Sequence, residues 1–502
     1  MIEVKTQKGS QILEESGTIP TTHNEKNQEP TFEKKNKKDT LIFRFSAATA
    51  YLIMETIGFN LVWTPLILPD LRNNDTNINP LGEPIEISEM SLLIGLPLVM
   101  YLSSIFFMVK LPNIIGRIET MKYMSIGMVF ANIAVAFGTH INFYYIARSI
   151  FIVLAGSALL AVQLYMREIV EDHNREKTMP LMYLALPNSY SYSFIVILMA
   201  SLGKFERVRY FTSILCTVPL VISLIFLYTF VPESPVYLAM KEKEEETMKT
   251  LRKLRSNKSN KEIEQDYLKI GDISKSRMES EKSGFLTLFK TPALRGDMIV
   301  ALVADITQHL SGVAVIMPFL GPIFMEAHTQ PSGYILVILL IIGCTVTLSV
   351  FLLIRIINKR IGKRALLLFS FCSTGISLIL HGLYFLSKTK NISFIENIRL
   401  LPVFSIITYV VVYFFGLGPY SLLIVELFPS DLKSAATFLN TIIVTFLMIV
   451  TSTVFPIAVE YIGIHWCIWT FSFFSFLGSC FVYFKLTVMK GKSPSGIQND
   501  LC

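Results

Sequence analysis

Charged residues are scarce in this chain of 502 residues: they make up 17% of the sequence, against 52% for hydrophobic residues. Soluble domains carry about 25% charged residues, so this composition excludes an ordinary soluble protein. Cysteine is also scarce. Five of the six cysteines lie in apolar runs, which excludes a framework of disulfides in loops. The six are Cys216, Cys344, Cys372, Cys467, Cys480 and Cys502.

Sequence signatures of catalysis are missing as well. The chain has no nucleophile elbow and no phosphate-binding loop, and its seven histidines are scattered without the spacing of metal ligands. We therefore expect no enzyme, no metal site and no cofactor. The formal net charge of +7 arises from basic residues in the loops between apolar segments. It therefore does not indicate a nucleic-acid partner, and we expect none.

Long apolar runs are what the sequence has instead. Twelve runs are about 20 residues long, enough to cross a hydrocarbon core of roughly 30 Å. We therefore predict an all-α membrane protein with twelve transmembrane helices in a lipid bilayer. The predicted spans are 42–65, 88–109, 121–139, 143–166, 180–202, 210–231, 297–325, 332–355, 365–386, 400–425, 436–459 and 464–486.

The distribution of Lys and Arg orients these spans. The N-terminal tail and the loops after even-numbered spans hold most of the cations. The exceptions are Lys204, Arg207 and Arg209 after the fifth span and Lys388 and Lys390 after the ninth. The positive-inside rule thus puts both termini in the cytoplasm. The glycosylation sequons at Asn74 and Asn391 then fall in outer loops. We expect a glycosylated, multi-pass protein of the cell membrane.

One long polar segment divides the spans into six and six. Its Lys and Glu residues, such as Lys241 to Glu246, have the spacing of short solvated helices. The predicted organisation is a cytoplasmic tail (1–40), a six-helix bundle (41–234), a cytoplasmic helical linker (235–293), a second six-helix bundle (294–488) and a cytoplasmic tail (489–502).

The two halves carry matching signals at their cytoplasmic ends, which indicates an internal repeat. A glycine followed directly by a basic residue stands after the second span and again after the eighth. A Glu stands at the end of the fourth span and of the tenth span, and each is followed by a basic residue seven positions later. Solvated loop pairs are the simpler interpretation. Two repeated bundles can also rock about a central site if acid–base pairs latch one side. The latch candidates are Gly116, Arg117, Glu168, Arg175, Lys363, Arg364, Glu426 and Lys433.

Several motifs in the expected places resemble the sugar porter family of the major facilitator superfamily. They are Pro232-Glu233-Ser234-Pro235, Gln308-His309-Leu310-Ser311-Gly312 and Glu426-Leu427-Phe428-Pro429; Trp63-Thr64-Pro65 resembles the insect facilitated trehalose transporters. The resemblance implies the major facilitator fold with two six-helix pseudo-repeats. It also implies carriage of a sugar, such as trehalose or a hexose, by alternating access without ATP hydrolysis, and adds Glu233 to the latch.

The substrate-binding candidates are Gln308, His309, Ser311 and Asn440. Gln308 could instead bridge two helices. Most other family positions for sugar contact hold residues that cannot make the same hydrogen bonds, and an unpaired buried polar group costs about 1–3 kcal/mol. Either the substrate is less polar than glucose, or unidentified residues hold the sugar, or transport has been lost.

Two acidic residues within predicted spans, Asp305 and Glu55, are candidate proton carriers, because ionisable groups in membranes are costly and usually functional. Asp305 could instead lie near enough to the cytoplasm to stay hydrated, and Glu55 could simply form a hydrogen bond to a neighbouring helix. Breaks at Gly58 and Pro65 in the first span and at Gly312 in the seventh point to the binding centre, or to helix packing alone. We expect facilitated diffusion; the alternatives are a proton-coupled sugar symporter and a transporter-like nutrient sensor that does not transport.

Overall fold

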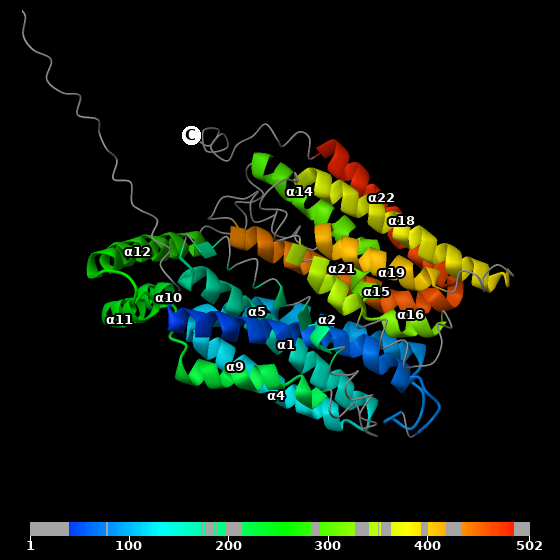
Figure 1. Ribbon diagram of the computed structural model, residues 1–502, viewed down its shortest axis with the longest axis horizontal. Coiled ribbons are helices and arrows are strands. Elements are labelled where there is room, and N and C mark those ends of the chain that lie inside the picture. The colour runs from blue at the N-terminus through cyan, green and yellow to red at the C-terminus, as the bar shows by residue number, and fades with distance from the viewer. Residues whose placement is uncertain are drawn as a thin grey trace, which may run out of the picture. The chain divides into compact units, whose positions relative to one another are not determined.

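The structure is a computed structural model (Figure 1) and describes residues 40–76, 79–171, 174–175, 178, 182, 184–185, 188–189, 191–193, 195, 213–282, 292–326, 341–349, 351–352, 363–392, 400–417 and 433–485. The first half contains α1 (Leu41–Leu71), α2 (Ile87–Met108), α3 (Leu111–Ile115), α4 (Arg117–Phe137), α5 (Ile141–Ile169) and α9 (Val218–Thr229). The polar linker forms α10 (Pro235–Met240), α11 (Glu244–Leu254) and α12 (Asn260–Lys282).

The second half contains α14 (Pro292–Gln308), α15 (Ala314–Ile316), α16 (Leu320–Glu326), α18 (Lys363–Thr389), α19 (Leu401–Val412), α21 (Lys433–Ile462) and α22 (Ile464–Lys485). Two π-helical turns interrupt it: η1 (His309–Val313) continues α14, and η3 (Tyr413–Leu417) continues α19.

The helices match the predicted spans wherever the structure describes them. Eight are long and apolar enough to cross a membrane, and two shorter apolar helices cover 213–229 and 401–415. These ten coincide with ten of the twelve predicted spans. Most of the other two predicted spans, 180–202 and 332–355, lies outside the described residues. The all-α membrane fold is confirmed, and the count of twelve stays a prediction.

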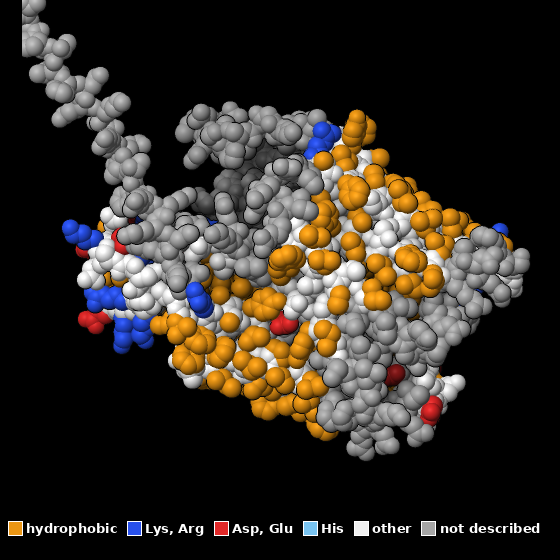
Figure 2. Space-filling view, viewed as in Figure 1, with side chains coloured by type: hydrophobic (Ala, Val, Ile, Leu, Met, Phe, Trp, Pro, Cys, Tyr) orange, Lys and Arg blue, Asp and Glu red, His pale blue; other side chains and the backbone are white. Residues whose placement is uncertain are grey.

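Large apolar side chains cover the outside of these helices. Phe106, Phe130, Phe473 and Phe484 are each more than half exposed, and Figure 2 shows hydrophobic side chains over much of the face in view, with charged ones gathered beside α10 to α12. Contiguous exposed apolar surface of this extent is not tolerated in water. It is the surface expected of helices that face lipid.

Buried apolar residues form a core that both halves share at one end. It combines α1, α2, α4 and α5 with α15, α16, α18, α19, α21 and α22, and includes Leu68, Leu71, Phe324 and Tyr409. The loops that hold Asn74 and Asn391 are also at this end, which we call the far end.

At the opposite end, called the latch end, the described residues form separate cores. One lies within the first half, with only Leu254 of the linker added, and includes Met54, Ala158 and Leu220. The other lies within the second half, around Met298 and Phe371. Buried apolar residues therefore join the halves at the far end, whereas the buried clusters described at the latch end are separate. The halves still touch there through an edge-to-face contact of Phe106 in α2 with Phe438 in α21, whose ring centroids are 5.4 Å apart.

The halves approach closely where α1 meets α16. A side chain at Gly321 would place its Cβ 2.1 Å from the carbonyl oxygen of Pro65, so the two backbones touch. Small residues permit this kind of helix contact in membranes. One prediction fails nearby: α1 runs unbroken from Leu41 to Leu71 through Gly58 and Pro65, because a membrane helix can absorb a proline without ending.

The linker helices form a small unit of their own. Val236, Leu251, Ile263 and Ile270 make its apolar core, and mixed charges cover α11. The short solvated helices predicted for this segment are therefore present. Figure 1 shows α10, α11 and α12 together beyond the ends of α1 and α5.

Candidate functional site

The latch end is organised by a sharp turn at Gly116. This residue separates α3 from α4 with φ of 110°, a conformation that disfavours any residue with a Cβ. A Cβ at this position would lie 2.6 Å from Oε2 of Glu233. Gly116 therefore allows α4 to begin directly at Arg117, with Glu233 packed against the turn.

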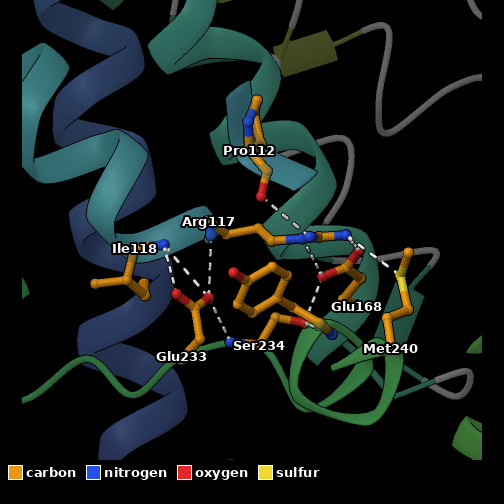
Figure 3. Close-up of polar contacts among 8 residues, drawn as sticks. Pro112, Arg117, Ile118, Glu168, Glu233, Ser234 and Met240 are labelled. Carbon is orange, nitrogen blue, oxygen red and sulfur yellow. Dashed lines mark hydrogen bonds and ion pairs between the residues drawn. The ribbon is translucent and has the colours of Figure 1, made fainter. Parts of the chain in front are cut away.

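Arg117 turns inward and forms a two-pronged ion pair with Glu168 at the end of α5 (Figure 3). Its Nε donates to Oε2 at 3.0 Å and its Nη2 to Oε1 at 2.9 Å. Both side chains are inaccessible to water, at 1% and 0% exposure. Nη1 also donates to the carbonyl of Pro112 at 3.1 Å, and the hydroxyl of Ser234 donates to Glu168. This pair joins α3, α4, α5 and the start of the linker.

Glu233 caps the beginning of α4. Its carboxylate accepts from the backbone N–H groups of Arg117 at 3.2 Å, Ile118 at 3.2 and 3.3 Å and Ser234 at 2.8 Å. An anion is favoured at a helix N-terminus. Burial raises the pKa of Glu233 above its usual value, while these N–H groups and the charge of Arg117 act in the opposite direction.

The sequence-predicted latch is only partly assembled by described residues. Gly116, Arg117, Glu168 and Glu233 meet as above, whereas Arg175 is exposed and donates to the carbonyl of Arg167 at 3.5 Å. Glu168 therefore pairs in two places with Arg117, and the seven-residue spacing between Glu168 and Arg175 gave no sign of this partner.

The second-half counterparts are less completely described. Glu426 lies outside the described residues, as do the side chains of Lys363 and Lys433, whose residues begin α18 and α21. Arg364 donates to the carbonyl of Tyr483 at 2.8 Å and lies over its ring, which ties α18 to α22. The repeat is thus visible in where the basic residues stand, at the start of helices.

A charged cluster missed by the sequence analysis lies beside the latch. Glu171, just past α5, forms ion pairs with two cations of the linker, Lys258 at 3.0 Å and Arg255 at 3.9 Å. Both cations also pair with Asp266 of α12. These side chains are 11–18% exposed. They fasten the linker to the first half. The signal available in the sequence was a second acidic residue, Glu171, three residues after Glu168.

The second half holds a polar cluster where its two π turns occur. Such turns are rare and concentrate at functional sites. Gly312 in η1 has φ of 95°, and a Cβ there would lie 2.6 Å from the ring of Phe471. Gln308, the last residue of α14, donates to the hydroxyl of Tyr413 in η3 at 3.1 Å. The predicted break at Gly312 is therefore present.

Asp305 connects this cluster to α21. Its carboxylate accepts from the amide of Asn440 and lies 3.5 Å from Nδ1 of His309, which also contacts the carbonyl of Asp305 at 2.9 Å. The hydroxyl of Ser311 donates to the backbone carbonyl of Gln308 at 2.6 Å. The structure thus brings Gln308, His309 and Asn440 into one region with Asp305, and the Ser311 hydroxyl is bonded within its own helix.

Glu55 lies elsewhere, in α1, where it is buried and accepts from the amide of Asn188 at 2.8 Å. A second buried ionisable group of the first half was missed: Arg148 of α5. It donates to the carbonyl and side chain of Asn60 and to Thr64, and lies over the ring of Trp63. A basic residue within a predicted span was the signal available in the sequence.

Two sequon asparagines are exposed in far-end loops, Asn74 after α1 and Asn391 after α18, whereas the sequon Asn257-Lys258-Ser259 lies between α11 and α12. Accessible loop positions are what N-glycosylation requires.

Comparison with known proteins gives consistent matches. The model of the family described as "Sugar (and other) transporter" matches residues 20–501. The probable metabolite transport protein CsbC of Bacillus subtilis is 26% identical over 77% of this chain and 80% of its own length. The facilitated trehalose transporter Tret1 of Polypedilum vanderplanki is 27% identical over 77% and 74%. The inward-open xylose transporter XylE from E. coli superposes with a TM-score of 0.70 at 17% identity, over 88% of this chain and 96% of that one.

Proposed function

Because this chain belongs to the sugar (and other) transporter family, we propose that it carries a sugar, such as trehalose or a hexose, across the cell membrane by facilitated diffusion. The sugar class is suggested by relatives such as the facilitated trehalose transporter of Polypedilum vanderplanki. The observation that carries the mode of action is the asymmetry of the core: the halves share apolar packing at the far end and have separate cores at the latch end.

Alternating access follows from that asymmetry. When the latch end opens, the far-end core seals the other side, and the solute reaches the polar cluster around Gln308 from the cytoplasm. When the latch end closes, the far-end core must part. Charged groups at the latch end suit this exchange, because water solvates them in the open state and fixed partners satisfy them in the closed one.

Facilitated diffusion is favoured over proton symport by the surroundings of Arg148. The partners that the structure gives this buried cation are Asn60, Thr64 and the ring of Trp63. None of these groups gains or loses a proton near neutral pH. A proton cannot break this contact in the way that it would break a buried ion pair. Asp305 and Glu55 stay candidates for a proton-coupled alternative.

The direct test is uptake of radiolabelled trehalose and glucose into proteoliposomes that contain the purified chain. We expect saturable uptake of at least one sugar, with no requirement for ATP and no dependence on an imposed proton gradient. Gradient-driven accumulation that is lost in Asp305→Asn or Glu55→Gln would replace this proposal with symport. Sugar binding without any uptake would support the alternative of a nutrient sensor.

Both termini are proposed to be cytoplasmic, which makes the far end extracellular. Supporting this, Lys and Arg are concentrated in the tail and loops of the latch end, and two of the three sequons lie at the far end. The third, Asn257-Lys258-Ser259, lies in the linker and is expected to stay unmodified in the cytoplasm. We expect glycosidase treatment of the protein from a eukaryotic membrane to increase its gel mobility. The shift should shrink in Asn74→Gln or Asn391→Gln and vanish in the double variant. A shift that survives in the double variant would contradict the orientation.

A further inference from the structure

Asp305 is a buried carboxylate whose described partners include no lysine or arginine. Its residue is 2% exposed, and its carboxylate contacts the neutral amide of Asn440 and the ring of His309. A carboxylate buried in a membrane protein is costly without a nearby positive charge. Within the described residues, the one other ionisable side chain against this carboxylate is His309, at 3.5 Å.

The amides around Asp305 leave oxygen atoms unused. Nε2 of Gln308 donates to the hydroxyl of Tyr413, and Nδ2 of Asn440 donates to the carboxylate of Asp305. The remaining polar atoms, Oε1 of Gln308 and Oδ1 of Asn440, are enclosed and have no hydrogen-bond partner in the described part of the chain. An enclosed, unpaired acceptor costs about 1–3 kcal/mol. Gln308 itself is only 4% exposed.

These acceptors belong to one region. Asp305 and Gln308 are three residues apart on α14 and therefore share a helix face, and Asn440 reaches Asp305 from α21. The π turn η1 begins at the next residue, His309. The cluster therefore offers one carboxylate and two amide oxygens as acceptors, and a ligand that satisfies them must bring hydrogen-bond donors and a positive charge.

We propose that Asp305 is a specificity-determining residue of the carrier, and that it selects hydroxylated solutes that bear a protonated amine, such as amino sugars. The ammonium group donates to Asp305 and supplies the missing charge, and a second donor of the solute reaches Gln308 or Asn440. This inference rests on the proposed transport of sugars and narrows the class of substrate.

The test compares uptake of glucosamine, glucose and N-acetylglucosamine into proteoliposomes in a mildly acidic buffer. N-acetylglucosamine keeps the sugar frame but loses the charge. We expect the wild-type chain to carry glucosamine with about a tenfold higher kcat/KM than either neutral sugar, as one charge-assisted hydrogen bond provides. Asp305→Asn should bring the ratio to about one, and Asp305→Glu, which keeps the charge, should retain the preference.

Glu460→Gln is the matched control, because it removes an exposed carboxylate at the other end of α21 from Asn440 and should leave the ratio between sugars unchanged. Equal kcat/KM for the three sugars in the wild type would overturn the inference and leave the proposed sugar transport intact. So would a preference that survives in Asp305→Asn.

If the liposomes take up none of the sugars, the proposed function fails, and binding decides the inference separately. Glucosamine should then raise the thermal transition of the wild-type chain in detergent and not that of Asp305→Asn. No stabilisation by glucosamine, or equal stabilisation by glucose, would overturn the inference.

Discussion

Substituting Glu168 with glutamine should destabilise the protein by about 3–5 kcal/mol, because it removes the charged carboxylate that the buried guanidinium of Arg117 binds in two places. Both partners are almost inaccessible to water, and the pair is two-pronged. The loss is measurable as a lower denaturation midpoint of the purified protein in detergent. Transport should fall as well, because the latch end can no longer close on a satisfied pair.

Arg175→Gln is the matched control for this variant. Arg175 stands seven residues after Glu168 but is exposed, and exposed ion pairs contribute about 0–1 kcal/mol. A larger loss of stability in Arg175→Gln than in Glu168→Gln would contradict the assignment of Arg117 as the principal partner. Replacing Arg117 and Glu168 together with methionine should restore much of the stability but not transport.

Substituting Gly312 with alanine is the second change with a large expected effect. A residue with a Cβ is strained at a φ of 95° by about 1–3 kcal/mol. The added Cβ would also lie 2.6 Å from the ring of Phe471, and overpacking costs typically 1–3 kcal/mol more. We expect a loss of about 2–6 kcal/mol, measured by denaturation in detergent, and a severe loss of uptake.

Two further variants separate the two causes. Gly296→Ala lies in the same helix region, in α14, where a Cβ would meet nothing within 4 Å, and should be neutral or slightly stabilising. In the Gly312→Ala background, Phe471→Ala should relieve the steric clash and leave the backbone strain. If Gly312→Ala is as harmless as Gly296→Ala, the π turn is not needed for the structure of the polar cluster.

The membrane architecture could be predicted from the sequence because hydropathy is a local property. Each apolar run has to satisfy its own backbone hydrogen bonds as a helix, so the described spans coincide with the predicted ones. The motif residues Gly116, Arg117, Glu168 and Glu233 could likewise be assigned to one end, because the topology places the ends of their helices together.

Pairings between helices could not be predicted in the same way. Arg117 contacts Glu168 across 51 residues of sequence, and helix rotation, which hydropathy does not fix, decides that contact. The same limit applies to Arg148 with Asn60 and to Asp305 with Asn440. Asp305 could be identified as unusual from its apolar neighbours, but its lack of a lysine or arginine partner emerges only when the helices that surround it are in place.

Counterflow in proteoliposomes tests whether the chain carries its solute by alternating access. Vesicles with the purified chain are loaded with unlabelled sugar and diluted into a trace of the labelled sugar. We expect a transient accumulation of label above its outside concentration, because a carrier exposes one site to each side in turn, and we expect Glu168→Gln to lose it. Label that only equilibrates, with no overshoot, would contradict alternating access.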